Sequence, residues 1–254
     1  MSFTAITRGV SPSLNQCELG YLPRRQIDIR VAVRQHSVYE NCLRELGATV
    51  ISLPPEPDLA DSMFVEDPAI VVPELAILTR MGAESRRNEG ESLAPVLARF
   101  RPIRKMVEPG TIEGGDVLQI GSTLFAGLSS RTNRQGIEQL AEILRPFGYS
   151  VKAVPVRGCL HLKSACSYLG GETVLVNRQW IDVSCLEGLR LVDVPAEEPH
   201  AANVLAIDQA VLVAAAFPAT AALLERLGWK VRMLDISELM KAEAGLTCSS
   251  ILFG

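Results

Sequence analysis

Several features that are common in other protein classes are missing from this sequence of 254 residues. No apolar run approaches the roughly eighteen residues that a membrane-spanning helix needs, and the longest candidate, residues 211–219, is far too short. The N-terminus lacks a basic stretch followed by a long apolar one, so no signal peptide is expected. The six cysteines form no Cys-x-x-Cys pair, which argues against a structural zinc site and a disulfide scaffold. We therefore expect a cytoplasmic protein with reduced thiols.

Neither sign of charge dominates the chain. It holds 25 Lys and Arg against 29 Asp and Glu, a net charge of −4 with the two signs interspersed. Since nucleic acids require a basic surface, neither nucleic acid nor membrane is expected as a partner. The composition, 48% apolar and 21% charged, is typical of a globular protein, and the length allows one large domain or two small ones.

One arrangement of short elements recurs along the chain. Each unit has two short strands that form a hairpin, then a helical stripe that ends near a glycine, then a third strand. The hairpins are expected at residues 69–78, 117–126, 162–176 and 204–214, the helices at 37–46, 93–100, 137–144 and 223–227, with a shorter segment at 184–188, and the third strands at 48–53, 103–107, 151–156, 189–194 and 231–234. Ser37 and Glu40 have the spacing of a capping box, which predicts that the first helix starts at Ser37.

The last strand, around residues 248–253, has no partner within its own unit. Residues 3–7 can form that partner, and the first and last strands then complete one hairpin. The chain closes into a ring of five units, which removes the exposed sheet edges that an open array would leave. The sequence therefore predicts an α/β fold of repeated hairpin-helix-strand units with pseudo-five-fold symmetry, in a single domain that spans residues 1–254.

A polar or nucleophilic residue stands at the start of the first strand of each hairpin. These residues are Asp67, Glu113, His161, Asn203 and Cys248, which follow one another at intervals of 42 to 48 residues. Equivalent positions of a five-fold ring converge on its axis, so two acids, an imidazole, an amide and a thiol are expected to face one central pocket. The chain has only three histidines, and one of them falls in this set.

Each residue type in this set suits a particular chemistry. Cys248 is the candidate nucleophile, and His161 is its candidate charge partner or general acid. Carboxylates such as Asp67 and Glu113 repel each other unless they hold a cation, and a planar guanidinium pairs bidentately with carboxylate. Glu66 adds another acid beside Asp67. A metal is not expected, because one histidine and one thiol make a weak ligand set.

Six short motifs, in order and spread over nearly the whole chain, match one known family. The motifs are Asp61-Ser62-Met63-Phe64-Val65-Glu66-Asp67, Gly82-Ala83-Glu84-Ser85-Arg86-Arg87, Glu113-Gly114-Gly115-Asp116, Ser130-Arg131-Thr132-Asn133, Leu160-His161-Leu162-Lys163-Ser164 and Leu246-Thr247-Cys248. In these motifs the chain resembles the dimethylarginine dimethylaminohydrolase family of the guanidine-modifying pentein superfamily. The resemblance implies a five-bladed α/β propeller, a monomer or homodimer, and a hydrolase without cofactor that converts Nω-methylated L-arginine to L-citrulline and a methylated amine.

The resemblance also implies a role for each matched residue. Cys248 would attack the guanidinium carbon to give a covalent thiouronium intermediate, and His161 would protonate the departing amine and then activate water. Glu113 and Asp67 would hold the guanidinium, with Glu66 on the same wall. The other expected substrate contacts are Arg86 and Arg131 to the carboxylate, Asp61 to the α-ammonium, Leu19 in a flexible lid, and the backbone carbonyl of Ala242.

Some positions depart from the family pattern or carry a structural expectation. Met81 stands where the family usually has proline, so a looser turn is expected there. Ala242 replaces a larger aliphatic residue, so a roomier pocket is expected. Asp116 is expected to satisfy the backbone around the turn at residues 114–115. Cys159 is expected to pack on the opposite face of the strand that carries His161.

Two other functions stay open on the sequence. A sister hydrolase that acts on arginine, citrulline or another small guanidine or ureido compound would share the thiol, the imidazole and the acids. A non-catalytic methylarginine-binding protein would have no need of a nucleophile. Thiol labelling separates an enzyme from a binding protein, since an enzyme is expected to have a reactive, substrate-protected Cys248.

Overall fold

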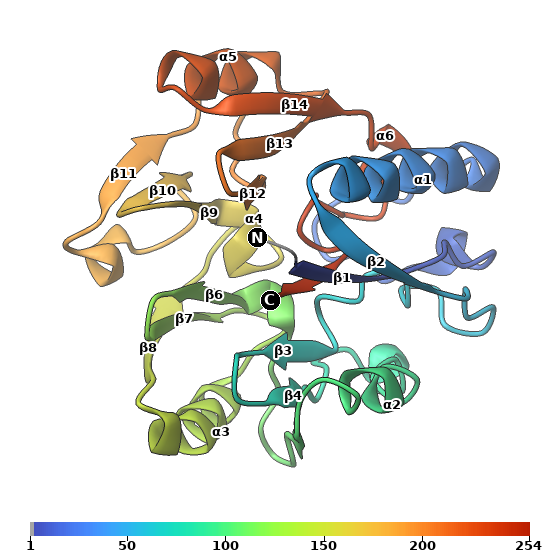
Figure 1. The fold of residues 1–254 in the computed structure, drawn as a ribbon, viewed down its shortest axis with the longest axis vertical. Coiled ribbons are helices and arrows are strands. Elements are labelled where there is room, and N and C mark those ends of the chain that lie inside the picture. Colours follow the sequence, from blue (N-terminus) through green and yellow to red (C-terminus); the bar gives the residue numbers. More distant parts are fainter. Residues whose placement is uncertain (1–2) are drawn as a thin grey trace.

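The computed structural model describes residues 3–254, and its strands form five sheets around a common axis (Figure 1). Each sheet is three-stranded, with an antiparallel pair and a further strand that runs parallel to the middle one. From the axis outward the sheets contain β15 (Ile251–Phe253), β1 (Phe3–Arg8) and β2 (Ala48–Leu53); β3 (Ala69–Val71), β4 (Ala76–Leu78) and β5 (Ile103–Lys105); β6 (Val117–Ile120), β7 (Thr123–Leu128) and β8 (Ser150–Pro155); β9 (Cys166–Gly170), β10 (Thr173–Val176) and β11 (Arg190–Asp193); β12 (Leu205–Ile207), β13 (Ala210–Ala214) and β14 (Lys230–Leu234). The predicted α/β ring of five units is confirmed.

Helices lie on the rim of the ring and link the middle strand of a sheet to its outer strand (Figure 1). Parallel strands need such a crossover connection, which explains why a helical segment follows each hairpin. The rim helices are α1 (Ile29–Glu45), α2 (Ala94–Leu97), α3 (Arg134–Leu144) and α5 (Pro218–Arg226), and a 3-10 turn, Val183–Leu186, takes this place between β10 and β11. Two further short helices, α4 (Leu162–Ala165) and α6 (Ser237–Met240), precede the inner strands β9 and β15.

The two ends of the described chain meet in one sheet. Strand β1 pairs antiparallel with β15, with Ile6 opposite Ile251, and parallel with β2. The predicted closure of the ring by residues 3–7 is therefore confirmed, and the pairing brings the segment just before β15, which holds Cys248, to the axis.

The prediction that the first helix starts at Ser37 was wrong. Helix α1 begins at Ile29, because the carboxylate of Asp28 accepts hydrogen bonds from the backbone N–H groups of Arg30 and Val31. Ser37 therefore lies inside the helix, and Glu40 accepts a hydrogen bond from Thr7 on β1 instead of capping. The predicted end is correct, since the chain leaves the helix at Gly47 with φ of 95°.

The predicted strand over residues 162–169 was wrong in its first half. Residues 162–165 form the helical turn α4, and β9 begins only at Cys166. His161 caps this turn in an extended conformation, and its carbonyl accepts the N–H of Ser164. The expected helix over 93–100 is likewise only the four-residue α2.

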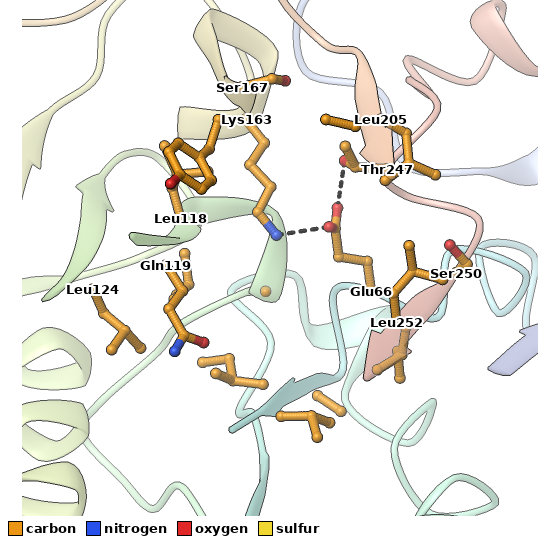
Figure 2. Close-up of a pocket in the computed structure, with 18 of the residues that line it drawn as sticks. Glu66, Leu118, Gln119, Leu124, Lys163, Ser167, Leu205, Thr247, Ser250 and Leu252 are labelled. Carbon is orange, nitrogen blue, oxygen red and sulfur yellow. Dashed lines mark hydrogen bonds and ion pairs between the residues drawn. The ribbon is translucent and has the colours of Figure 1, made fainter. Parts of the chain in front are cut away.

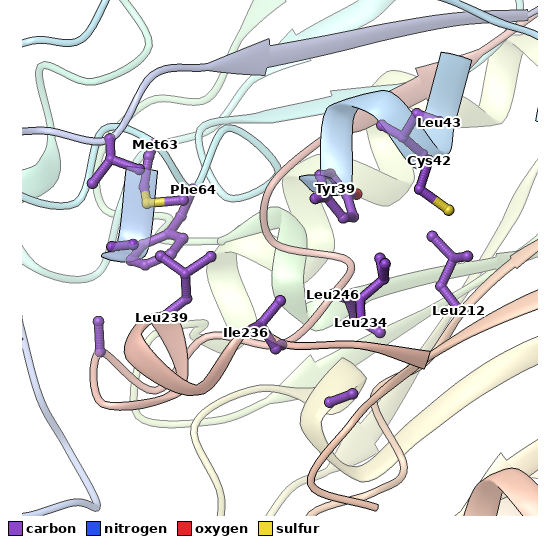
Figure 3. Close-up of a cluster of buried hydrophobic side chains, with 14 of the residues drawn as sticks. Tyr39, Cys42, Leu43, Met63, Phe64, Leu212, Leu234, Ile236, Leu239 and Leu246 are labelled. Carbon is purple, nitrogen blue, oxygen red and sulfur yellow. The ribbon is translucent and has the colours of Figure 1, made fainter. Parts of the chain in front are cut away.

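A large buried cluster joins α1 to the last sheet (Figure 3). It holds side chains of α1 together with residues of β13, β14, α6, the link between β14 and α6, and the segment before Cys248, namely Tyr39, Cys42, Leu43, Leu212, Leu234, Ile236, Leu239 and Leu246. The Tyr39 hydroxyl also shares a hydrogen bond of 2.6 Å with Ser250. The segment that carries Cys248 thus packs against this cluster, through Leu246 and through Cys248 itself. Within residues 3–254, no helix has the length and hydropathy to cross a membrane.

Candidate active site

The residues that the sequence placed at equivalent positions lie in the short segments just before the inner strands. Asp67 precedes β3, Glu113 precedes β6, His161 precedes β9, Asn203 precedes β12 and Cys248 precedes β15. They stand two to five residues ahead of these strands, because the chain enters each sheet through a turn. All of them lie near the axis, where contacts between segments far apart in the sequence connect them.

The imidazole of His161 lies between two carboxylates. Its Nε2 is 2.7 Å from Oε2 of Glu113, and its Nδ1 is 3.9 Å from Oδ1 of Asp67. Burial by itself lowers the pKa of His161, but the charges of Asp67, Asp116 and Glu113 outweigh it and raise the pKa to about 9. His161 is therefore an imidazolium at neutral pH.

Glu113 is the matching anion. Burial by itself raises its pKa, but the hydrogen bond and charge of His161, with Arg86 and Arg131, lower the pKa to about 2. Its other oxygen, Oε1, accepts the backbone N–H of Gly82 at 3.0 Å. Glu113 is fully buried, so its carboxylate is a fixed negative charge in contact with the imidazolium of His161.

The glycine pair after Glu113 lets these groups approach. The N–H of Gly115 donates to Oδ1 of Asp67 at 3.1 Å. A Cβ atom at position 115 would lie 2.6 Å from Nδ1 of His161 and 2.7 Å from Oδ1 of Asp67, closer than real Cβ contacts allow. Only glycine fits between the imidazole and the acid.

Asp116 fixes the segment of His161. It is fully buried and accepts hydrogen bonds from the N–H of Leu162 at 2.8 Å and from the hydroxyls of Ser129 and Thr132. The expected structural role is thus present, but the backbone it satisfies follows His161 and is not the glycine turn itself. Cys159 packs in the core as expected, although it lies in a turn and not on a strand.

The two arginines are buried beside the acids. Arg86 donates from Nη1 to Oδ2 of Asp67 at 3.0 Å, and from Nε and Nη2 to both oxygens of Glu89 at 2.9 and 2.8 Å. Nη1 of Arg131 lies 3.5 Å from Glu113 and is buried without a hydrogen-bond partner among residues 3–254. Sequence reasoning missed Glu89, although its spacing of three residues from Arg86 is the signal that could have found it.

Cys248 is partly buried, and its Sγ accepts the N–H of Gly245 at 3.4 Å. Burial, and then the negative charges of Glu66 and Asp67, raise its pKa to about 12. The resting state is therefore a thiol, not a thiolate paired with His161. The sequence alone did not decide between the thiol and the thiolate form of Cys248.

Glu66 points into a cavity of about 250 Å³ at the centre of the ring (Figure 2). Its two oxygens accept hydrogen bonds from Nζ of Lys163 at 2.6 Å and from Oγ1 of Thr247 at 2.7 Å. Asn203 donates to the same Thr247 hydroxyl at 3.1 Å. The carboxylate of Glu66 is therefore used to hold the segment before Cys248, a partnership with Lys163 and Thr247 that the sequence did not reveal.

Hydrogen bonds join the loop that carries Leu19 to Asp61 and to the residue that follows Ala242. The N–H of Glu18, which precedes Leu19, donates to Oδ2 of Asp61 at 3.0 Å. On the other side of Leu19, backbone N–H groups bond the carboxylate of Glu243, which follows Ala242. The loop that carries Leu19 is thus anchored beside both of the other residues.

Asp67, Glu113 and His161 also form a group that could hold a metal ion, since each offers one atom within 4.8 Å of the others. A metal ion would require neutral His161 and would compete with Arg86 for Asp67. The raised pKa of His161 and the Arg86 ion pair instead match an internally paired charge cluster.

Comparison with known proteins shows close relatives of this chain. A family model described as arginine deiminase matches residues 53–186. The N(G),N(G)-dimethylarginine dimethylaminohydrolase of Pseudomonas aeruginosa is 35% identical over 228 residues, which cover 89% of this chain and 90% of the relative. The protein of the same name from Streptomyces coelicolor is 39% identical over 248 residues, covering 97% and 95% of the two chains.

Solved structures agree with these relatives. A cysteine-to-serine mutant of the Pseudomonas aeruginosa enzyme, complexed with citrulline, has a TM-score of 0.92 at 32% identity and covers 100% of both chains. A histidine-to-glycine variant of a dimethylarginine dimethylaminohydrolase, as an adduct with S-methyl-L-thiocitrulline, has a TM-score of 0.93 at 33% identity and covers 99% of this chain and 100% of the other.

Proposed function

The chain belongs to the dimethylarginine dimethylaminohydrolase family, and we propose that it hydrolyses Nω-methylated L-arginine to L-citrulline and a methylated amine. The observation that carries the proposal is the buried Glu113–His161 pair at 2.7 Å, at the axis of the ring where the Cys248 segment also ends. A thiol, an imidazolium and fixed acids are the groups that cysteine-dependent hydrolysis of a guanidinium needs.

Charge complementarity supports a cationic amino acid as substrate. Asp67 and Glu113 supply the acids for the guanidinium, since each carboxylate oxygen can accept more than one hydrogen bond. Arg131 has a buried Nη1 without a partner among the described residues, and Arg86 uses three of its five N–H groups. Both therefore retain donors for the substrate carboxylate. Asp61 and the carbonyl of Ala242 bind the α-ammonium, and Leu19 covers the substrate.

Binding of the substrate activates Cys248. A guanidinium beside the thiol favours the thiolate, because an opposite charge lowers the pKa that Glu66 and Asp67 raise. The thiol proton leaves to solvent, and the thiolate attacks the guanidinium carbon. The imidazolium of His161 then gives its proton to the departing methylated amine, which leaves a covalent thiouronium on Cys248.

Water completes the reaction. Neutral His161 takes a proton from a water molecule, whose oxygen attacks the thiouronium carbon. Collapse of this second adduct breaks the C–S bond and releases citrulline, and the proton of the added hydroxyl passes through solvent to the departing thiolate, which restores the resting thiol of Cys248. Glu113 holds the imidazole in place through both steps and stabilises its charged form.

The decisive experiment is product analysis with asymmetric dimethylarginine, monomethylarginine, arginine and citrulline. We expect citrulline and a methylated amine from the methylated substrates, loss of both products in Cys248→Ala, and full activity in Cys185→Ala, which removes the other partly exposed cysteine. Turnover of arginine or citrulline alone would instead assign a sister hydrolase. Binding of methylarginine without turnover of any compound would assign a binding protein.

We also propose that the chain acts as a single cytoplasmic catalytic domain, as a monomer or homodimer without nucleic acid or membrane partners. Pairing of β1 with β15 supports one domain, because both ends of the described chain contribute to one sheet. Light scattering coupled to size exclusion measures the oligomeric state directly.

A further inference from the structure

The loop over residues 15–27, here called the lid loop, is closed at its base. The side chain of Asn15 donates from Nδ2 to the carbonyl of Ile27 at 3.0 Å and accepts the N–H of Ile27 at 2.8 Å. Arg24 donates to the carbonyls of Asn15 and Cys17. These hydrogen bonds fix the two ends of the lid loop to each other.

The tip of the lid loop is held by one carboxylate. The N–H groups of Tyr21 and Leu22 each donate to Oε1 of Glu243 at 2.6 Å, and the N–H of Gly20 lies 3.1 and 3.0 Å from its two oxygens. Hydrogen bonds to an ionised acceptor are stronger than neutral ones, so three such bonds make a firm attachment.

Apolar packing adds little to this attachment. Tyr21 and Leu22 are 47% and 40% exposed. A cavity of about 480 Å³ lies beside the tip, lined by residues 21–23 of the loop and by the segment around Glu243. Segments with few buried apolar contacts open at low free-energy cost, so the bonds to Glu243 are the main restraint on the tip.

Glu243 belongs to the segment that carries the other parts of the site. It follows Ala242 and precedes Gly245, whose N–H donates to Sγ of Cys248. Glu243 has φ of 60°, a left-handed conformation that is uncommon for a residue other than glycine and that depends on support from its surroundings. This conformation occurs where the chain turns from α6 toward Cys248.

We propose that Glu243 is a positioning residue, which latches the lid loop so that Leu19 is held over the substrate. Leu19 lies between two anchors, since the N–H of Glu18 bonds Asp61 and the N–H of Gly20 bonds Glu243. The latch rests on the proposed function for its catalytic consequence, because Leu19 covers a substrate only if the site binds one. It ties the lid to the same segment that ends in the nucleophile.

Amide hydrogen exchange of the ligand-free protein tests the latch without any substrate. In Glu243→Ala we expect exchange at Gly20, Tyr21 and Leu22 to be faster by about tenfold or more, since their hydrogen bonds are lost. Glu243→Gln keeps one acceptor oxygen without the charge and is expected to give a smaller increase. The exposed Glu225→Ala on α5 is the matched control, with unchanged exchange at these amides.

Steady-state kinetics with dimethylarginine test the positioning role. If the lid is closed for a smaller fraction of the time, apparent affinity falls by that fraction. We expect KM to rise about tenfold in Glu243→Ala and less in Glu243→Gln, with kcat within about twofold of the unaltered protein. A merely structural role would lower the amount of active protein and leave KM unchanged.

Two results would overturn the proposal. Unchanged exchange at Gly20, Tyr21 and Leu22 in Glu243→Ala would show that the latch does not hold the loop. Faster exchange with an unchanged KM would show that the latch has no part in substrate binding. Absence of turnover in the unaltered protein would count against the proposed function, and amide exchange would then decide the latch by itself.

Discussion

Nε2 of His161 lies 2.7 Å from Oε2 of Glu113, although the two residues are 48 positions apart in the sequence. Each stands just before the inner strand of its own sheet, so the contact joins neighbouring units of the ring at the axis. Both side chains are buried, and each stabilises the charged form of the other. The chemistry of the site therefore depends on the five-fold arrangement as much as on the residue types.

The protonation of His161 gives a first prediction. Its pKa of about 9 means that the imidazolium is the main form below that pH and is lost above it. In the proposed mechanism His161 protonates the leaving amine, so we expect kcat to fall as the pH rises through the pKa of His161 in the substrate complex, which the cationic guanidinium lowers from its ligand-free value of about 9. Titration of the ring C–H signals by NMR measures the pKa directly, and only three histidines need assignment.

Glu113→Gln is the matching control for this titration. It removes a negative charge and keeps the shape, so the pKa of His161 is expected to fall below its value in the unaltered protein. An unchanged pKa in this variant would mean that Asp67 and Asp116 alone set it, and the assigned function of Glu113 as partner of the imidazolium would be wrong.

Gly115→Ala is expected to disable the site without unfolding the protein. The added Cβ would stand 2.6 Å from Nδ1 of His161, so the imidazole or Asp67 must move. Misplacement by about 1 Å typically costs about a hundredfold in rate, and we expect a fall in kcat/KM of that order. Gly90→Ala, where the nearest atom would be 3.6 Å away, is the control and should keep full activity. Equal activity of the two variants would contradict the packing described here.

Glu89 is predicted to matter for stability far more than its neighbour Glu84. Glu89→Ala breaks a buried bidentate pair with Arg86, and such a loss typically costs about 3–5 kcal/mol. Glu84 makes an exposed ion pair with Arg87 on the same segment, and its removal is expected to cost less than about 1 kcal/mol. Urea unfolding of both variants measures the difference, and similar midpoints would refute the importance of the buried pair.

Glu66→Gln is expected to make Cys248 more reactive. The negative charge of Glu66 is one cause of the raised pKa of this thiol, after burial, and Lys163 would be left as an uncompensated positive charge nearby. The pH at which Cys248 is half-maximally alkylated should therefore fall in the variant. The exposed Glu91→Gln should leave it unchanged, and Cys248→Ala corrects for the five other cysteines.

The raised pKa of the Cys248 thiol also changes how thiol labelling should be interpreted. From the sequence, a reactive Cys248 was expected to distinguish an enzyme from a binding protein. A pKa raised to about 12 means that the ligand-free enzyme is expected to label slowly. Slow labelling alone therefore no longer favours a binding protein, and product formation is the sharper criterion.

Much of the architecture could be predicted from local patterns. Short apolar runs on either side of a turn predicted the hairpins, and the unpaired last strand predicted closure by residues 3–7. The predictions of helix starts and of short helical turns were less accurate. The start of α1 depends on Asp28, and the turn at α4 depends on a hydrogen bond from Leu162 to Asp116, which is 46 positions away.

The sequence by itself determined the repeat, because the pairing of strands within a hairpin and the chemistry of its turn are local, and the repeat fixed which five residues approach the axis. Only the tertiary structure decided their partners and charge states. Three of these contacts join segments that no local sequence pattern relates to each other. They are the contacts of Glu66 with Lys163, of Arg86 with Asp67 and of Glu243 with the lid loop. The pKa values follow from these pairings and from burial, which are properties of the folded chain, so the resting thiol of Cys248 and the imidazolium of His161 could be assigned only once the ring was closed.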